Sequence, residues 1–207
     1  MINVLIIEDQ RMMRETMEMY VTQAEGYHLY GSFSAAGDAE RFCDLSQVDL
    51  ILMDICTEHD ESGFVATKAI KLRCPKIKII IVTSMLDAGY LNRAREVGAD
   101  SIYFKDVSQT ELMTVVEQTM RGESVYPEKT PEVRIGNIQS SEFTEAEVRV
   151  LHLMVEGMTY KEMAGELGVT ADCVKKHISN MLFKTGFSSK TKLTAMVVSK
   201  RLIVNGF

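Results

Sequence analysis

Short apolar runs in the first part of the chain alternate with stretches whose apolar residues recur at helical spacing. The runs cover residues 4–7, 28–33, 50–53, 77–82 and 101–104, and Asp, Gly, Ser or Pro bounds each of them. Because parallel strands need crossover connections, strands that alternate with helices favour a parallel sheet covered on both faces. The pattern therefore predicts an α/β domain with a doubly wound, five-stranded parallel sheet.

The helical stretches indicate which side chains face the sheet. A helix from about Met12 presents an apolar stripe that packing against a sheet would bury. The expected inward positions are Met13, Met17, Tyr20 and Val21 in this helix, Phe64, Thr67, Ala69, Ile70 and Leu72 in a second, and Leu112, Val115, Val116 and Thr119 in a third.

The last part of the chain has a purely helical pattern. Thr144 and Glu147 form a capping box for a first helix, and Thr170 can cap a third one after a glycine turn at Gly168. The four expected helices cover about residues 145–156, 160–167, 171–185 and 190–202. The expected inward residues are Val148, Leu151, Leu153 and Val155 in the first helix, Val174, Ile178, Met181 and Leu182 in the third, and Leu193, Ala195, Met196 and Val197 in the fourth. The second and third helices form a candidate helix-turn-helix.

The stretch between these two parts shows no sustained period. It carries Pro127 and Pro131 together with several Gly, Ser and Thr residues, which is typical of a linker. We therefore expect a first domain over residues 1–122, a linker over residues 123–140 and a separate all-α, four-helix domain over residues 141–207.

Composition and charge indicate a cytoplasmic protein with two unlike modules. No apolar run approaches the ~20 residues of a membrane span, and the first residues lack a basic leader, so we expect no membrane partner. Up to Lys129 the chain holds 13 Lys and Arg against 21 Asp and Glu, and the remainder holds 10 against 8. No acidic residue follows Cys173, so the basic end suits a polyanion.

Acidic side chains follow two of the predicted strands. Glu8 and Asp9 follow the first strand, and Asp54 follows the third. Since ligands of such sheets gather at the carboxyl ends of the strands, these carboxylates are expected to converge. Each acid taken singly is more often a turn or a helix cap. Together they need a cation, and all-oxygen ligands favour Mg²⁺, which leaves room for a phosphate oxygen.

The fourth and fifth strands add a hydroxyl and an amine at the same edge. Thr83 ends the fourth strand and Lys105 follows the fifth. Lys105 would pair with a phosphoryl group, and Thr83 would donate a hydrogen bond to it. Asp54 lies at the centre and is placed to be the nucleophile that accepts the phosphoryl group.

These residues lie in motifs that resemble the receiver domains of two-component response regulators. The motifs are Glu8-Asp9, Leu52-Met53-Asp54-Ile55, Val82-Thr83-Ser84 and Tyr103-Phe104-Lys105. The resemblance covers about residues 1–122 and implies a flavodoxin-like or CheY-like fold, with phosphorylation of Asp54 by a sensor histidine kinase. It also implies that Tyr103 turns inward with Thr83 as the switch. The implied Mg²⁺ ligands are Glu8, Asp9, Asp54 and the backbone carbonyl of Cys56.

The loop after Asp54 departs from the family pattern. The family has Met-Pro and then a Gly eight residues after the acceptor, whereas Gly63 is nine residues after Asp54, and the acidic residues Glu58, Asp60 and Glu61 precede it. The extra residue follows the metal ligands, so its expected influence is on kinase docking or on the lifetime of the phosphoryl group.

The third helix of the second part has a polar outward face. Lys175, Lys176 and Ser179 fall on this face in the amino-terminal half, where a recognition helix meets bases. Lys donates to guanine, and Ser contacts any base. The alternative is an ordinary solvated helix face. The basic residues further along, which suit phosphates, are Lys184, Lys190 and Lys192.

The second part also resembles a known family, the LuxR/NarL-type DNA-binding domains. The matching stretches are residues 143–147, 157–164, 174–178 and 184–186. The resemblance covers about residues 141–207 and implies a homodimer on double-stranded DNA, at an operator with two half-sites. It points to Lys175, Lys176 and Ser179 as base-facing, and to Thr159, Lys161, His177 and Lys184 as DNA-backbone contacts. His177 also fits a packing role.

The hypothesis that follows is a transcription regulator that dimerises when Asp54 is phosphorylated. An enzyme with an aspartyl-phosphate intermediate is a first alternative, but it would need a general acid two residues after the nucleophile, where Cys56 stands. A regulator that binds DNA constitutively, without control by phosphorylation, is a second alternative that the altered loop leaves open.

Overall fold

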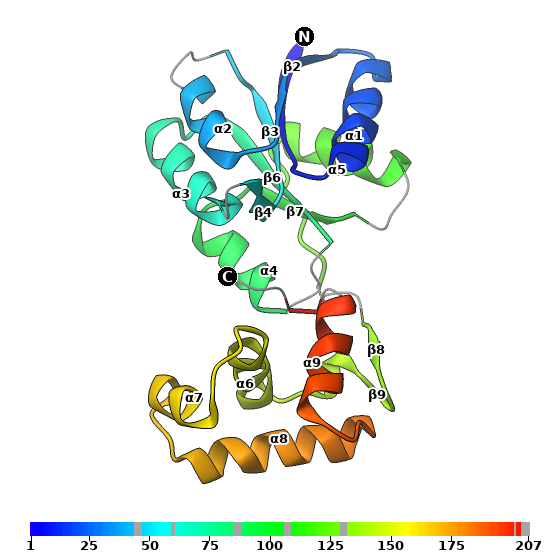
Figure 1. Ribbon diagram of the computed structural model, residues 1–207. Coiled ribbons are helices and arrows are strands. Elements are labelled where there is room, and N and C mark those ends of the chain that lie inside the picture. The colour runs from blue at the N-terminus through cyan, green and yellow to red at the C-terminus, as the bar shows by residue number, and fades with distance from the viewer. Residues whose placement is uncertain are drawn as a thin grey trace. The chain divides into compact units, whose positions relative to one another are not determined.

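The computed structural model describes residues 1–43, 47–58, 61–84, 88–105, 109–128, 132–200 and 202–203. The chain divides into two compact units, Met1–Ser84 with Ala88–Lys129 in one and Thr130–Phe207 in the other (Figure 1). Asp60 of the acidic loop and residues 129–131 of the expected linker lie outside the described residues. Among the described residues, no helix has the length and apolar character needed to cross a membrane.

The first unit is built on a five-stranded sheet whose neighbouring strands pair in parallel, in the order β2-β1-β3-β6-β7. The chain runs from β1 outward to β2 and then returns to β3 on the other side of β1. The carboxyl ends of β1 and β3 therefore meet at the point where the strand order reverses, which is where such sheets bind ligands. The strands are β1 (Ile2–Ile7), β2 (Tyr27–Phe33), β3 (Leu50–Met53), β6 (Lys78–Thr83) and β7 (Ser101–Phe104).

Helices cover both faces of this sheet (Figure 1). One face carries α1 (Arg11–Gln23) and α5 (Gln109–Met120). The other face carries α2 (Ala36–Cys43), α3 (Gly63–Arg73) and α4 (Ala88–Glu96). The predicted doubly wound α/β fold is thus confirmed.

The buried helix faces follow the predicted stripes, with one exception. Met17 of α1 and Leu112 of α5 are each 2% exposed and pack on the same face of the sheet. The prediction was wrong at Leu72 of α3, whose side chain is 77% exposed. Leu72 comes two residues after the buried Ile70, which is about 200° around the helix, so the two side chains face opposite ways.

A short antiparallel hairpin follows β3 in the loop that departs from the family pattern. Its strands are β4 (Cys56–Thr57) and β5 (Glu61–Ser62). Beyond β4, the Glu58 N–H donates to the Ser34 carbonyl at 2.9 Å, and Ser34 Oγ donates to Glu58 Oε2 at 2.6 Å. These bonds join the described part of the loop to the residue that follows β2.

The second unit begins with a small hairpin and continues as a helical domain. Thr144 caps α6 in the predicted capping box, and Gly168 ends α7 in the left-handed conformation before Thr170 caps α8. The predicted all-α helix-turn-helix domain is confirmed. Its elements are β8 (Arg134–Ile135), β9 (Ile138–Gln139), the 3₁₀ helix η2 (Ser140–Glu142), α6 (Glu145–Val155), α7 (Tyr160–Leu167), α8 (Ala171–Thr185) and α9 (Lys190–Ser199).

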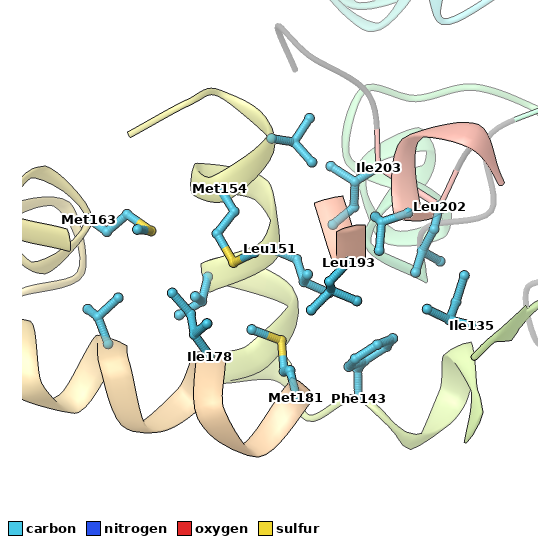
Figure 2. Packing of buried hydrophobic residues seen from close by; sticks show 14 of the residues in the cluster. Ile135, Phe143, Leu151, Met154, Met163, Ile178, Met181, Leu193, Leu202 and Ile203 are labelled. Carbon is cyan, nitrogen blue, oxygen red and sulfur yellow. The ribbon is translucent and has the colours of Figure 1, made fainter. Parts of the chain in front are cut away.

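The helices enclose one apolar core, shown in Figure 2, to which Leu151, Ile178 and Leu193 contribute from three of them. The prediction that Ala195 faces inward was wrong, since that residue is exposed. The inward stripe of α9 runs through Leu193 and Val197, which are four residues apart. Ala195 lies midway between them and therefore on the opposite side of the helix.

The hairpin of β8 and β9 lies in the stretch that the sequence pattern assigns to a linker. Ile135 is fully buried and Ile138 is 8% exposed, and both belong to the core of the second unit. Strands of two residues are too short to show a period, so the alternation that reveals a longer strand is absent here.

Candidate functional site

Backbone hydrogen bonds bring the predicted site residues to one edge of the sheet. The Asp54 N–H donates to the Ile7 carbonyl at 2.9 Å, so the residue after β3 lies beside the end of β1. The Lys105 N–H donates to the Thr83 carbonyl at 2.8 Å, which aligns the ends of β7 and β6 in the same way. The five-stranded sheet thus positions the acids, the hydroxyl and the amine together, as the strand pattern predicts.

The side chain of Lys105 forms ion pairs with two of the acids. Its Nζ lies 2.6 Å from Glu8 Oε2 and 2.8 Å from Asp54 Oδ2. All three side chains are at most 6% exposed. The other oxygen of Asp54, Oδ1, accepts the Ile55 N–H at 2.8 Å. The carboxylate of Asp54 is therefore held in one orientation by a cation and a backbone donor.

The three carboxylates can supply oxygen ligands to one cation. One oxygen from each of Glu8, Asp9 and Asp54 lies within 4.8 Å of the other two. Among the described residues, the buried Oδ1 of Asp9 has no hydrogen-bond partner. A buried carboxylate oxygen without a donor is costly unless a cation faces it. The residues therefore fit a small, hard divalent cation such as Mg²⁺.

Burial and mutual repulsion raise pKa values in this cluster. Burial and then the charge of Asp54 raise the pKa of Glu8 to about 7, against the lowering effect of Lys105. Burial also raises the pKa of Asp54, although the Lys105 ammonium and the Ile55 N–H favour its charged form. The single positive charge of Lys105 thus neutralises only part of the negative charge of the carboxylates. A bound divalent cation would neutralise more of it.

Cys56 lies in the loop that follows Asp54, and Gly63 begins the helix after that loop. Burial and the neighbouring acids raise the pKa of the Cys56 thiol to about 12, so the thiol stays protonated at neutral pH. The Gly63 N–H donates to the Ile55 carbonyl at 2.8 Å. A Cβ at Gly63 would lie 1.9 Å from the Asp54 carbonyl oxygen, so only glycine allows this approach. The sequence pattern did not single out this role of Gly63, although the position of a glycine after the loop was a signal.

Tyr103 and Thr83 lie on opposite faces of the sheet. In the register of β6 and β7, Tyr103 pairs with Val82, and Thr83 pairs with Phe104. Side chains paired across parallel strands point to the same face. Tyr103 and Val82 pack with the α1 and α5 residues, so Thr83 faces the other layer. In this structure Tyr103 thus does not face Thr83, which argues against the expectation that the two side chains move together on phosphorylation.

The residues expected to face DNA bases lie exposed on α8. Lys175, Lys176 and Ser179 are exposed, while Val174 and Ile178 are buried. Lys175 Nζ makes an ion pair with Asp172 Oδ1 at 2.9 Å, and both side chains are more than half exposed. Such surface pairs are weak and open readily, so Lys175 is available to a polyanion.

The residues expected to contact the DNA backbone differ in their exposure and in the contacts that they already make. Lys161 and Lys192 are exposed, and His177 is half-buried. Thr159 Oγ1 caps α7 by accepting the Glu162 N–H at 3.4 Å, which leaves its own hydroxyl proton to donate. The remaining two lysines make contacts within the unit: Lys190 Nζ lies 5.0 Å from the centre of the Tyr160 ring, and Lys184 Nζ lies 2.8 Å from Glu147 Oε2.

Phe183, which is 89% exposed on α8, was not among the residues predicted to contact DNA. It follows Ser179 by four residues and Lys176 by seven, so the three side chains share one stripe of the helix. A large exposed apolar side chain within a polar, basic stripe was a readable signal.

Comparison with known proteins agrees with both units. The model of the response regulator receiver domain matches residues 4–117, and the model of the luxR family of bacterial regulatory proteins matches residues 141–197. The chain belongs to the response regulators. Its second unit adds a domain of the luxR family of bacterial regulatory proteins, so this response regulator is a DNA-binding regulator of transcription and not an enzyme.

Curated relatives match almost the whole length of this response regulator. It is 31% identical over 207 residues to the response regulator protein VraR of Staphylococcus epidermidis, and 31% identical to VraR of Staphylococcus aureus. Each match covers 98% of this chain and 99% of the relative.

Solved structures show the same fold. RcsB of Salmonella enterica serovar Typhimurium, bound to a promoter in the presence of a phosphomimetic, matches with a TM-score of 0.63 and 19% identity, over 96% of this chain and 98% of that chain. A LuxR-family response regulator from an Aurantimonas species matches with a TM-score of 0.57 and 22% identity, over 60% of this chain and 88% of that chain.

Proposed function

We propose that this response regulator accepts a phosphoryl group on Asp54 from a sensor histidine kinase and, as a phosphorylated homodimer, binds an operator with two half-sites. The observation that carries the proposal is the buried cluster in which Lys105 Nζ lies within 2.8 Å of Asp54 and within 2.6 Å of Glu8. A lysine that holds an acceptor carboxylate among further acids is the arrangement that phosphoryl uptake needs.

In the transfer step, an Asp54 oxygen attacks phosphorus while the bond from phosphorus to the histidine nitrogen of the kinase breaks. We assign Glu8, Asp9, Asp54 and the Cys56 carbonyl as the residues that would hold Mg²⁺, which would reduce the repulsion between the attacking carboxylate and the phosphoryl oxygens. Lys105 is placed to exchange its contact with Asp54 for one with a phosphoryl oxygen.

The switch is proposed to start at Thr83. Its side chain is fully buried and ends β6 at the same edge as Asp54, so it can donate a hydrogen bond to the new phosphoryl group. Driving a conformational equilibrium from about 1% to about 99% needs roughly 5.5 kcal/mol, which exceeds one hydrogen bond. Contacts between two receiver domains are proposed to supply the remainder.

The second unit is proposed to place α8 in the major groove. Lys175, Lys176 and Ser179 would read bases, and the apolar ring of Phe183 suits a thymine methyl group further along the groove. The proposed phosphate contacts, which position the domain without specifying sequence, are Thr159, Lys161, His177, Lys190 and Lys192. Lys184 is not included, because its ammonium already pairs with Glu147.

The domain boundaries are also part of the proposal. The receiver domain would span residues 1–122, the linker residues 123–140 and the DNA-binding domain residues 141–207, with the β8–β9 hairpin as the end of the linker that packs on the second unit. Double-stranded DNA is the proposed partner, and the cytoplasm is the proposed site of action.

A combined phosphorylation and DNA-binding assay tests the proposal. The chain is mixed with Mg²⁺ and a small phosphodonor, a mass gain on Asp54 is sought, and the product is used to select duplexes from a random pool. We expect the mass gain in the parent and in Lys176→Gln but not in Asp54→Asn, and we expect Lys176→Gln to lose the selectivity of the parent. A mass gain in Asp54→Asn, or unchanged selection by Lys176→Gln, contradicts the proposal.

A further inference from the structure

The C-terminal end of α8 is fixed to α6 by a buried acid. Lys184 Nζ lies 2.8 Å from Glu147 Oε2, and it also donates to the Glu142 carbonyl at 3.3 Å. The Glu147 side chain is 3% exposed, and the Lys184 side chain is 33% exposed. One ammonium thus joins the last turn of α8 to η2 and to the first turn of α6.

One carboxylate oxygen of Glu147 accepts hydrogen bonds from two partners. Its Oε2 accepts the Thr144 N–H at 2.9 Å as part of the capping box, and it also faces Lys184. Burial alone would raise the pKa of Glu147, but the hydrogen bonds from Lys184 and Thr144 outweigh it and lower the pKa. If Lys184 turned away toward a phosphate, a nearly buried carboxylate would lose its only cation among the described residues. That loss makes such a movement unfavourable.

The turn between β8 and β9 holds the same end of α8 from another side. The Asn137 N–H donates to the Thr185 carbonyl at 3.1 Å and so satisfies one of the last carbonyls of the helix. Gly136 has φ +61°, and a Cβ there would lie 2.1 Å from the Thr185 oxygen. The last turn of α8 is therefore held by α6, by η2 and by the hairpin turn.

We infer that Lys184 and Glu147 are positioning residues of α8, which set the angle at which its amino-terminal half meets DNA, and that Lys184 does not itself contact the DNA backbone. The inference rests on the proposed function, in which Lys175, Lys176 and Ser179 read bases. Because these residues lie about one and a half to two and a half turns from Lys184, a small tilt at the fixed end displaces them from the base edges. Loss of the ion pair thus weakens recognition of sequence and leaves the number of phosphate contacts unchanged.

Salt dependence separates a positioning lysine from a lysine that contacts a phosphate. Each neutralised phosphate adds about 0.9 to the slope of log K against log salt concentration. We compare the full-length, phosphorylated parent with Lys184→Gln, and we use Lys192→Gln as the matched control, since Lys192 is exposed and is a proposed phosphate contact. The probes are a duplex selected by the parent and a random duplex of equal length.

We expect Lys192→Gln to lower the salt slope by about 0.9 for each subunit on both duplexes. We expect Lys184→Gln to keep the slope of the parent on the random duplex, and to lose roughly tenfold in its preference for the selected duplex, the size of one lost base contact. If Lys184→Gln lowers the slope as Lys192→Gln does, Lys184 contacts a phosphate and the inference is wrong.

A double-variant comparison tests whether Lys184 acts through Glu147. We expect the double variant Glu147→Gln, Lys184→Gln to lose no more of the preference for the selected duplex than either single variant. If the losses of the two single variants add in the double variant, the inference is wrong. Lys184→Arg retains a cation, so we expect it to keep the parent's preference for the selected duplex. This variant shows that a substitution at position 184 does not by itself prevent folding. If Lys176→Gln leaves the preference unchanged, the proposed reading of DNA by α8 fails instead.

Discussion

Lys105 Nζ lies 2.8 Å from Asp54 Oδ2, and both side chains are almost completely buried. The amine also pairs with Glu8, so one cation holds two acids at the edge of the sheet. Uptake of a phosphoryl group on Asp54 places new negative charge within reach of the same amine. This pair therefore links the stability of the receiver domain to its chemistry.

Replacing Lys105 tests that link. Lys105→Met leaves Glu8 and Asp54 buried without a cation, so we expect a loss of about 3 kcal/mol in the free energy of unfolding without Mg²⁺. Added Mg²⁺ should restore most of this loss, because it binds the folded state and replaces the missing charge. Urea unfolding at increasing Mg²⁺ concentrations measures the effect. The control is Lys78→Met, whose partner Asp100 lies at the far end of the strands; equal recovery by both variants would contradict the account.

Gly63 is expected to be required for the geometry of the acceptor. A Cβ at this position would lie 1.9 Å from the Asp54 carbonyl oxygen, so Gly63→Ala must displace the backbone of Asp54. We expect about 2 kcal/mol of lost stability and slower phosphoryl uptake from a small phosphodonor. Gly165→Ala is the control, since open space surrounds Gly165 on α7. Uptake by Gly63→Ala at the rate of the parent would show that the close approach has no role.

Thr83 and Tyr103 are expected to differ in their effect on the switch. Thr83→Ala should still take up the phosphoryl group but dimerise roughly tenfold more weakly, because it lacks the hydroxyl that donates to the phosphoryl group. Tyr103→Leu should dimerise like the parent, since its side chain lies on the α1 and α5 face. Sedimentation of each phosphorylated protein gives the dimerisation constants. The opposite ranking would support Tyr103, and not Thr83, as the switch residue.

Asp100 is expected to make the receiver domain sensitive to acid. Burial alone would raise the pKa of Asp100, but hydrogen bonds from Lys71, Lys78 and the Ile79 N–H lower it. The unfolded chain, with an Asp pKa of about 3.9, then binds more protons, so this contribution is present above that pH and is lost as the pH falls through the folded pKa.

Asp100→Asn measures that contribution. We expect the variant to be less stable than the parent by about 2 kcal/mol at neutral pH. The difference should shrink as the pH falls from about 5 to about 3, because the parent loses its ion pairs in this range. Urea unfolding at several pH values provides the comparison. A difference that stays constant over the range would mean that the charge of Asp100 is not the cause.

The sequence predicted the strands, and the gathering of charged residues at their ends, because these signals are local. Apolar runs of four to six residues mark the strands, and the strand ends place Asp54 and Lys105 at one edge without further information. The sequence did not show that Tyr103 faces α1 and α5, because the alternation within a four-residue strand depends on which residue enters the sheet first. That register is set by pairing with β6.

Contacts between distant residues could not be read from the sequence. Lys184 is 37 residues from Glu147, so nothing in the local pattern separates it from the exposed lysines on the same segment. The hairpin at Ile135 and Ile138 was not predicted for a related reason. Its two isoleucines are buried by helices that follow them in the chain. The predicted inward face of α9 was correct except at Ala195. The small side chain of alanine is found on either side of a helix, so its type did not indicate which way it faces.

The salt dependence of operator binding tests the central claim, control of DNA binding by phosphorylation, most directly. Dilute protein is titrated on a two-half-site operator at several salt concentrations, with and without a phosphodonor, and Asp54→Asn serves as the control. The account predicts a steeper salt slope after phosphorylation, approaching twice that of one domain, and no change for Asp54→Asn or for an operator with one half-site. Equal slopes with and without the phosphodonor would contradict it and would indicate constitutive binding.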